Sequence, residues 1–180
     1  TFTFTVPVSG DLQWEENEVF TLKMDYNRNN GTSGTAWAKA TLTNDDEGFS
    51  VATIADANEG STDAPGSITI RVVREGNLEG ASSVDWAISG SGTNRASTAG
   101  FTTDFAQALR GSVVFDGTET SYTGANGQTY SYKDVTVALS GDNTYETDET
   151  YTVTLSNAGE GSSIKTATAV GKIVNDDMGY

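Results

Sequence analysis

The sequence contains no cysteine and no histidine among its 180 residues. The lack of cysteine excludes disulfide bonds and thiolate metal sites, and the lack of histidine removes imidazole as a base or a metal ligand. Most hydrolase and transferase mechanisms thereby lose their base. No apolar run approaches the roughly 18 residues that span a bilayer. No basic start is followed by an apolar run, so any export signal is expected outside this sequence.

Positive charge is scarce, because 10 Lys and Arg stand against 25 Asp and Glu, for a formal net charge of -15. This charge repels nucleic acid and anionic membrane surfaces, so no nucleic-acid partner is expected. Carboxylates that crowd together repel one another and need a cation. Few lysines and abundant Thr, Ser, Gly, Asn and Asp are typical of large bacterial surface proteins. The composition therefore predicts an extracellular or cell-surface protein.

Helical periodicity is almost absent, whereas apolar and polar residues alternate in segments separated by turn residues. The alternation predicts strands at residues 19–24, 36–42, 68–72, 84–88, 113–115, 135–139, 151–155 and 167–173, with a further strand at residues 1–8. This pattern predicts an all-β, immunoglobulin-like antiparallel β-sandwich. Residues 105–109 are the one candidate for a helical turn.

The sequence repeats itself: residues 1–49 align with residues 132–180 at a constant offset of 131 without a gap. The identities gather in acidic turns, and apolar strand positions also agree, as where Phe20 falls on Tyr151. Such a period indicates an array of similar units. It predicts that residues 1–47 are the C-terminal strands of a preceding, incomplete repeat, that residues 48–178 are a complete repeat, and that residues 179–180 start a further one.

The incomplete repeat is expected to expose an apolar face and open sheet edges. Three coverings for this face remain open. The complete unit itself could cover it, a second copy of the chain could cover it in a homodimer, or strands outside this sequence could do so.

Acidic residues of the complete unit lie in its turns, so a sandwich is expected to gather them at one pole. Calcium takes six to eight oxygen ligands at roughly 2.3–2.6 Å, whereas magnesium demands a smaller octahedral shell and keeps its waters. Acidic turns are more often simply solvated, but here the same acids occur twice in register. Asp11, Glu15, Glu18, Asp45 and Asp46 fall on Asp142, Glu146, Glu149, Asp176 and Asp177.

We therefore predict calcium binding by the complete unit. The five acids of the first repeat are predicted to form a partial second metal site, because this repeat lacks counterparts of Glu59 and Asp104.

These residues resemble the Calx-beta domain, the calcium-binding sandwich of sodium/calcium exchangers, integrin β4 and many bacterial surface proteins. The resemblance covers residues 48–178, including Asn58-Glu59-Gly60, Thr103-Asp104-Phe105, residues 142–151 and Asn175-Asp176-Asp177. It implies that the family's calcium ligands fall on Glu59, Asp104, Asp142, Glu146, Glu149, Asp176 and Asp177. Exchanger domains carry a pair of acids at the position of Gly141-Asp142 and a third aspartate at that of Asn175. Fewer ions or weaker binding are therefore expected here.

The leading functional prediction is structural: calcium fixes the strand ends and stiffens a chain of neighbouring repeats. The alternative is a calcium-dependent module that binds a glycan or a cell-surface protein, with the outward-facing Trp37 as its platform. A glycosidase using Glu146 and Glu149 is a third class. It is disfavoured because acids that bind calcium stay ionised, whereas a general acid must hold a proton. No enzymatic activity is expected.

Overall fold

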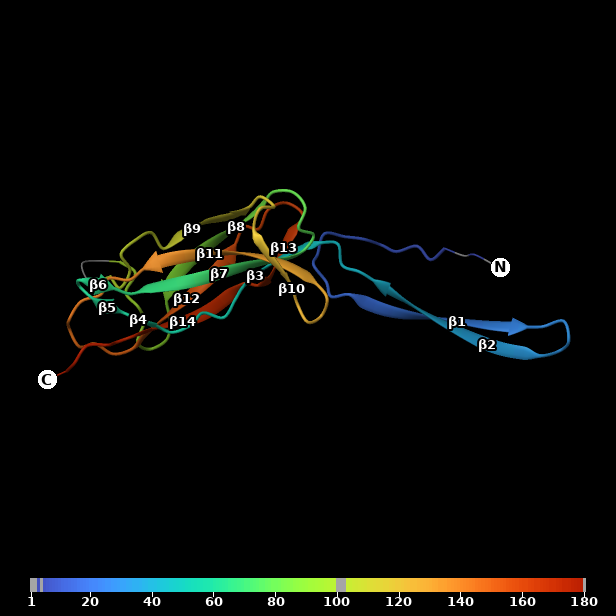
Figure 1. The fold of residues 1–180 in the computed structure, drawn as a ribbon, viewed down its shortest axis with the longest axis horizontal. Coiled ribbons are helices and arrows are strands. Elements are labelled where there is room, and N and C mark those ends of the chain that lie inside the picture. The colour runs from blue at the N-terminus through green and yellow to red at the C-terminus, as the bar shows by residue number, and fades with distance from the viewer. Residues whose placement is uncertain (1–2, 4, 100–102, 180) are drawn as a thin grey trace.

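The computed structural model describes residues 3, 5–99 and 103–179. These residues form strands and no helix, so the prediction of an all-β chain is confirmed. Figure 1 shows a sandwich, with a two-stranded ribbon that extends away from one end of it. Among the residues described, none forms a helix with the length and hydropathy that a membrane crossing requires.

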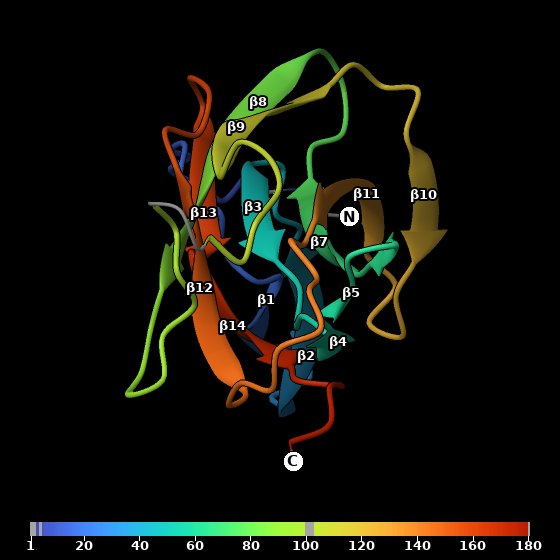
Figure 2. The same cartoon turned by 90° about the vertical axis from the view of Figure 1, so that its left-hand side faces the viewer.

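The sandwich consists of two five-stranded sheets, which Figure 2 shows from the end that holds β4 and β5. The first sheet has the order β10-β11-β7-β3-β13, with β3 at Glu47–Val51, β7 at Ser67–Gly76, β10 at Thr120–Thr123, β11 at Thr129–Ala138 and β13 at Ser162–Thr166. The second has the order β4-β14-β12-β8-β9, with β4 at Ala57–Asn58, β8 at Ser82–Gly90, β9 at Arg110–Phe115, β12 at Glu149–Ser156 and β14 at Thr168–Val174.

Neighbouring strands in both sheets run antiparallel, except for two edge pairs. Strand β13 pairs with β3 and β14 pairs with β4 in parallel. A short hairpin of β5 (Gly60–Ser61) and β6 (Ala64–Pro65) follows β4 at the same end of the sandwich. The predicted antiparallel sandwich is thus correct apart from these edges.

The core lies between the sheets and follows the period-two alternation of the sequence. Strand β7 buries Ile68, Ile70 and Val72 and turns the intervening residues outward. The facing sheet buries Trp86 and Val153. Burying one such side chain contributes about 1.5–3 kcal/mol, so the alternating residues fix which face of each strand turns inward.

The ribbon pairs β1 (Glu18–Asn27) with β2 (Ser33–Leu42). Its register is that of β12 and β14 in the sandwich, because Glu18 pairs with Leu42 as Glu149 pairs with Ile173. The two pairs differ in packing. Tyr151 of β12 is fully buried beneath the opposite sheet, whereas its counterpart Phe20 is half-buried. The complete unit therefore does not cover the apolar face of the ribbon.

Two sequence predictions are wrong in the described residues. Residues 3 and 5–8 form no strand, and the rest of the predicted 1–8 strand lies outside the described residues. The counterparts of residues 3 and 5–7 lie in β11, where they pair with β7, and no strand takes the place of β7 beside residues 5–8.

Residues 105–109 form no helical turn. Phe105 makes an isolated antiparallel bridge with Leu139, and the amide of Ala106 donates to the carbonyl of Ala138 at 3.0 Å. These bonds hold the segment against β11 and use groups that a helix would need.

Candidate functional site

The connections that carry the predicted acids of the complete unit lie at the end of the sandwich opposite the ribbon (Figures 1 and 2). Several connections supply them. Glu59 lies between β4 and β5, and Asp104 lies between β8 and β9. The connection from β11 to β12 supplies Asp142 and Glu146, and Glu149 is the first residue of β12. Asp176 and Asp177 follow β14.

Backbone contacts place Glu59 at the centre of this acidic pole. Its amide donates to the carbonyl of Val174 at 3.0 Å, which fixes it beside the end of β14. The chain turns sharply at Gly60, whose φ of 85° favours glycine. Gly141 approaches the same backbone so closely that a Cβ there would lie 2.6 Å from the carbonyl of Gly60. This approach brings the start of the β11–β12 connection onto Glu59, whose side chain is only 5% exposed.

Asp104 is fixed by hydrogen bonds on both sides of its connection. Its carbonyl accepts from the amide of Ser140 at 3.0 Å, which ties it to the end of β11. Its amide donates to the carbonyl of Ser97 at 3.1 Å, and its carboxylate accepts from the amide of Ser97. Asp104 therefore faces the pole, although it lies far from the other acids in sequence.

Asn175 organises the turn that carries Glu146. Its side-chain oxygen accepts from the amide of Glu146 at 2.9 Å, and its side-chain nitrogen donates to the carbonyl of Asp177 at 3.0 Å. Its own amide donates to the carboxylate of Asp148, which also pairs with Lys172. Asp148 is thereby neutralised by a lysine. The pattern of acids did not single out Asn175, although it is repeated as Asn44.

Three glutamates at the pole, Glu59, Glu146 and Glu149, hold their protons more tightly than exposed carboxyl groups do. Burial is the main cause that raises the pKa of Glu59 to about 7, followed by the charges of Glu146, Asp142, Asp104 and Asp177. Burial also raises the pKa of Glu149 to about 8, with a hydrogen bond to the Asp104 carboxyl as the next cause.

Partial desolvation raises the pKa of Glu146 as well, helped by the charges of Asp142, Asp104 and Asp177. Six of the seven predicted acids thus interact electrostatically. This environment favours a bound proton or a bound cation over free negative charge.

The two aspartates after β14 have different environments. Asp177 has a buried carboxylate oxygen, Oδ2, with no hydrogen-bond partner. Asp176 is exposed, and its Oδ1 accepts from the amide of Gly60 at 3.1 Å. Within residues 3, 5–99 and 103–179, no three Asp or Glu side chains are arranged so that they could hold a metal ion. The acids therefore share one region without meeting at a common point.

The predicted acids of residues 1–47 lie at a second site, a pocket of about 140 Å³ at the base of the ribbon. It brings together Asp11, Glu15, Glu18, Asp45 and Asp46. Desolvation raises the pKa of Asp46, followed by the charges of Asp45 and Asp11.

The hydrogen bonds of the complete unit recur around this second pocket. Asn44 accepts from the amide of Glu15 at 3.0 Å and donates to the carbonyl of Asp46 at 2.8 Å. These bonds match those that Asn175 makes with Glu146 and Asp177.

Trp37, the predicted platform, lies on the ribbon and is 65% exposed. The ammonium of Lys23 lies 6.0 Å from the centre of its ring. Strand β2, which carries Trp37, lies at the other end of the sandwich from β4 and β5 (Figure 1).

The fold is similar to solved structures of Calx domains. Apo-form Calx CBD1 matches with a TM-score of 0.52 and 21% identity over 73% of this chain and 98% of that domain. The CBD12 structure from CALX1.2 matches with a TM-score of 0.52 and 20% identity over 72% of this chain and 46% of that one. No family model and no curated protein matches the sequence. The predicted Calx-beta sandwich is thereby confirmed at the level of the fold.

Proposed function

We propose that residues 48–178 form a calcium-binding structural unit whose ion is held at the acidic pole. One observation carries this proposal: carboxyl groups from several separate connections lie close enough together at one end of the sandwich to raise the pKa of Glu59, Glu146 and Glu149. Such a cluster is unfavourable as free anions, and a divalent cation converts the repulsion into attraction. The fold shared with Calx CBD1 agrees with this role.

The donor set fits calcium better than other metals. It consists of carboxylate oxygens, with no histidine or cysteine in the sequence to favour zinc or copper. The buried Oδ2 of Asp177 has no hydrogen-bond donor beside it, and a bound cation would give this oxygen a partner. Glu59, Asp104, Asp142, Glu146, Glu149, Asp176 and Asp177 are the proposed ligands. Binding requires their side chains to turn toward a common point, which carboxylates on turns can do.

The chain's organisation extends the proposal to an array of units. Residues 1–47 repeat the strand register and the turn hydrogen bonds of the complete unit, which supports their assignment to a preceding repeat. The ribbon and the acidic pole lie at opposite ends of the long axis (Figure 1). Units joined in this way would form an extended stalk. We propose a secreted or cell-surface location and a mechanical role without catalysis.

The test is calorimetric titration with calcium, together with thermal melting, on the wild type and on Glu146→Ala. The wild type should bind calcium and melt at a higher temperature with it, since a ligand at 100 times its Kd adds about 2.7 kcal/mol of stability. Glu146→Ala should lose most of both effects. Glu160→Ala, in an exposed turn, is the matched control and should retain them. If the wild type shows neither uptake nor stabilisation, the proposal is wrong.

A second candidate function is calcium-dependent binding of a glycan or a cell-surface protein, which the exposure of Trp37 favours. Exposed aromatic rings suit sugar faces, and the polar side of the ribbon leaves this ring accessible. Polysaccharide gel retardation with calcium and with chelator, on the wild type and on Trp37→Ala, distinguishes this function from that of a spacer.

A further inference from the structure

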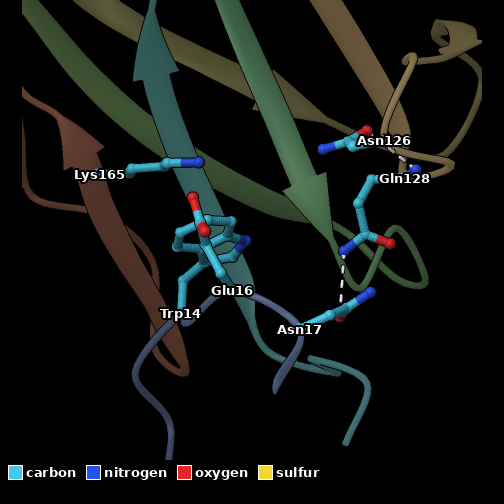
Figure 3. Close-up of a pocket in the computed structure, with 6 residues that line it drawn as sticks. All are labelled: Trp14, Glu16, Asn17, Asn126, Gln128 and Lys165. Atoms are coloured by element: carbon cyan, nitrogen blue, oxygen red, sulfur yellow. Dashed lines mark hydrogen bonds between the residues drawn. The ribbon is translucent and has the colours of Figure 1, made fainter. Parts of the chain in front are cut away.

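Trp14 belongs to the acidic turn before the ribbon, yet it contacts the complete unit. Its amide donates to the hydroxyl of Ser163 at 3.2 Å. Its ring lies against Gly48, where a Cβ would be 2.8 Å from ring atoms. The ammonium of Lys165 lies 3.5 Å from the ring centre, and Figure 3 shows it reaching over Trp14. Gly48 lies in β3, and Ser163 and Lys165 lie in the neighbouring β13, so the ring sits on the edge of one sheet.

The surface that receives Trp14 is held in place by the complete unit. Lys165 also pairs with Glu75 of β7 at 3.4 Å, so its ammonium is anchored independently of the ring. Glu47, which precedes Gly48, pairs at 2.9 Å with the fully buried Arg74. The ring therefore meets a fixed surface, in which glycine at position 48 leaves room for the indole.

Two further contacts surround the tryptophan. The amide of Asn77 donates to the carbonyl of Asp46 at 3.3 Å, which ties the turn after the ribbon to the end of β7. The side chain of Gln128 donates to Asn17 at 3.4 Å (Figure 3). Gln128 lies in the connection between β10 and β11. A pocket of about 250 Å³ remains beside the ring.

The same pair of residues recurs at the other end of the sandwich. By the offset of 131, Tyr145 is the counterpart of Trp14 and Gly179 is the counterpart of Gly48. A Cβ on Gly179 would lie 3.2 Å from the ring of Tyr145, so this glycine also lies against its aromatic partner. Tyr145 is 60% exposed. Gly179 and Tyr145 thus repeat the contact between Gly48 and Trp14. Within the described residues, no strand equivalent to β13 covers the ring of Tyr145.

We propose that the aromatic residue of the acidic turn is the docking residue between consecutive units. Trp14 docks the first repeat onto residues 48–178, and Tyr145 presents the same surface to a following unit of this type. The partner that fits Tyr145 is a sheet edge with glycine, serine and lysine at the positions of Gly48, Ser163 and Lys165. This inference rests on the proposed array of units, but it does not require calcium.

The first test measures amide residual dipolar couplings of the ribbon and of the sandwich in the full chain. One alignment tensor should fit both parts of the wild type. Trp14→Ala should require two tensors, and Trp14→Tyr should restore one, because tyrosine stands at the equivalent position 145. Trp37→Ala, on the exposed face of the ribbon, is the control and should keep one tensor. A single tensor in Trp14→Ala would overturn the assignment of Trp14.

The second test extends the chain by placing a second copy of residues 50–180 directly after Tyr180, which preserves the period. The two sandwiches should share one tensor, and Tyr145→Ala should separate them. Independent sandwiches in the unsubstituted extended chain would contradict the role of Tyr145. Calorimetry on Trp14→Ala should show unchanged calcium uptake at the Glu59 pole. If the wild type took up no calcium, the proposed function would be wrong. The docking roles of Trp14 and Tyr145 would still be tested by the alignment tensors.

Discussion

Glu149, the first residue of β12, lies beside Asp104, in the connection from β8 to β9, and the Asp104 carboxyl raises the pKa of Glu149 further than burial alone does. Burial and the Asp104 carboxyl raise the pKa of Glu149 to about 8, and burial with the surrounding charges raises that of Glu59 to about 7. The folded pole therefore binds protons at pH values where the unfolded chain has released them.

This proton binding predicts that the metal-free protein loses stability as the pH rises. A group whose folded pKa is raised contributes fully below its unfolded pKa of about 4.5, and the contribution is lost as the pH passes the folded pKa. The window for Glu59 and Glu149 thus extends from about pH 5 to pH 8. Each unit of pKa difference corresponds to about 1.4 kcal/mol, so a loss on the order of a few kcal/mol is expected.

Urea unfolding in chelator across this pH range measures the loss. The carboxyls whose pKa is lowered, such as those of Asp134 and Asp148, are ionised in both states above pH 5 and leave the slope unchanged. A free energy of unfolding that rises from pH 5 to pH 8 would contradict the assignment.

Glu59→Gln should have opposite effects on the stability of the metal-free protein and on calcium binding. The amide keeps the shape of the buried side chain but carries no charge, so it should raise the stability of the metal-free protein at pH 8. The same change removes a proposed ligand and should weaken calcium binding by about tenfold or more. Thermal melting with chelator and calorimetry with calcium measure the two effects. Glu160→Gln, on an exposed turn, should change neither.

Asn175→Asp should act in the opposite direction on the metal-free protein. Aspartate keeps the oxygen that accepts from the amide of Glu146 but loses the nitrogen that donates to the carbonyl of Asp177. It also adds a charge beside the pole. We expect a loss of about 1–3 kcal/mol in chelator, because the carbonyl loses its partner and repulsion grows. The gain in melting temperature on adding calcium should be larger than in the wild type. Asn175→Ser, which adds no charge, should lower stability without enlarging that gain.

Much of the fold could be predicted because strands with one buried face show alternating apolar and polar residues in the sequence. Alternation placed β7, β8 and β12, where one side of each strand faces the core. It failed where pairing depends on strands elsewhere in the chain. Residues 3 and 5–8 form no strand because no neighbouring strand takes the place that β7 has beside β11, and residues 105–109 form no helix because β11 supplies their hydrogen bonds.

The sequence predicted which acids lie at the acidic pole, but it did not predict the contacts of their carboxylates. Acids in the turns at one end of a sandwich must lie near one another, so the gathering of Glu59, Asp104 and Glu146 follows from topology. The direction of each carboxylate does not follow, because short-range bonds decide it. Asp176 turns to the amide of Gly60, and Asp148 is neutralised by Lys172. Metal ligation by the seven acids stays a prediction.

Gly171 of β14 lies directly opposite the fully buried Tyr151 of β12. A Cβ at this position would lie 2.3 Å from the Cζ and hydroxyl oxygen of the tyrosine, whose ring also meets Phe105 edge-on. The counterpart of Gly171 in the ribbon is Ala40, which lies opposite the half-buried Phe20. The ring of Phe20 is not packed beneath a second sheet, so the methyl group of Ala40 fits beside it.

Gly171→Ala should therefore lower the free energy of unfolding by about 1–3 kcal/mol, because a buried ring in a packed core cannot move aside without displacing its neighbours. Chemical unfolding measures the loss. Gly10→Ala is the matched control, since a Cβ there meets nothing within 4 Å. If Tyr151 is the cause, the additional change Tyr151→Phe should recover part of the loss, because it removes the hydroxyl oxygen at the point of contact. A loss that Tyr151→Phe leaves undiminished would place the strain in the backbone of β14 instead.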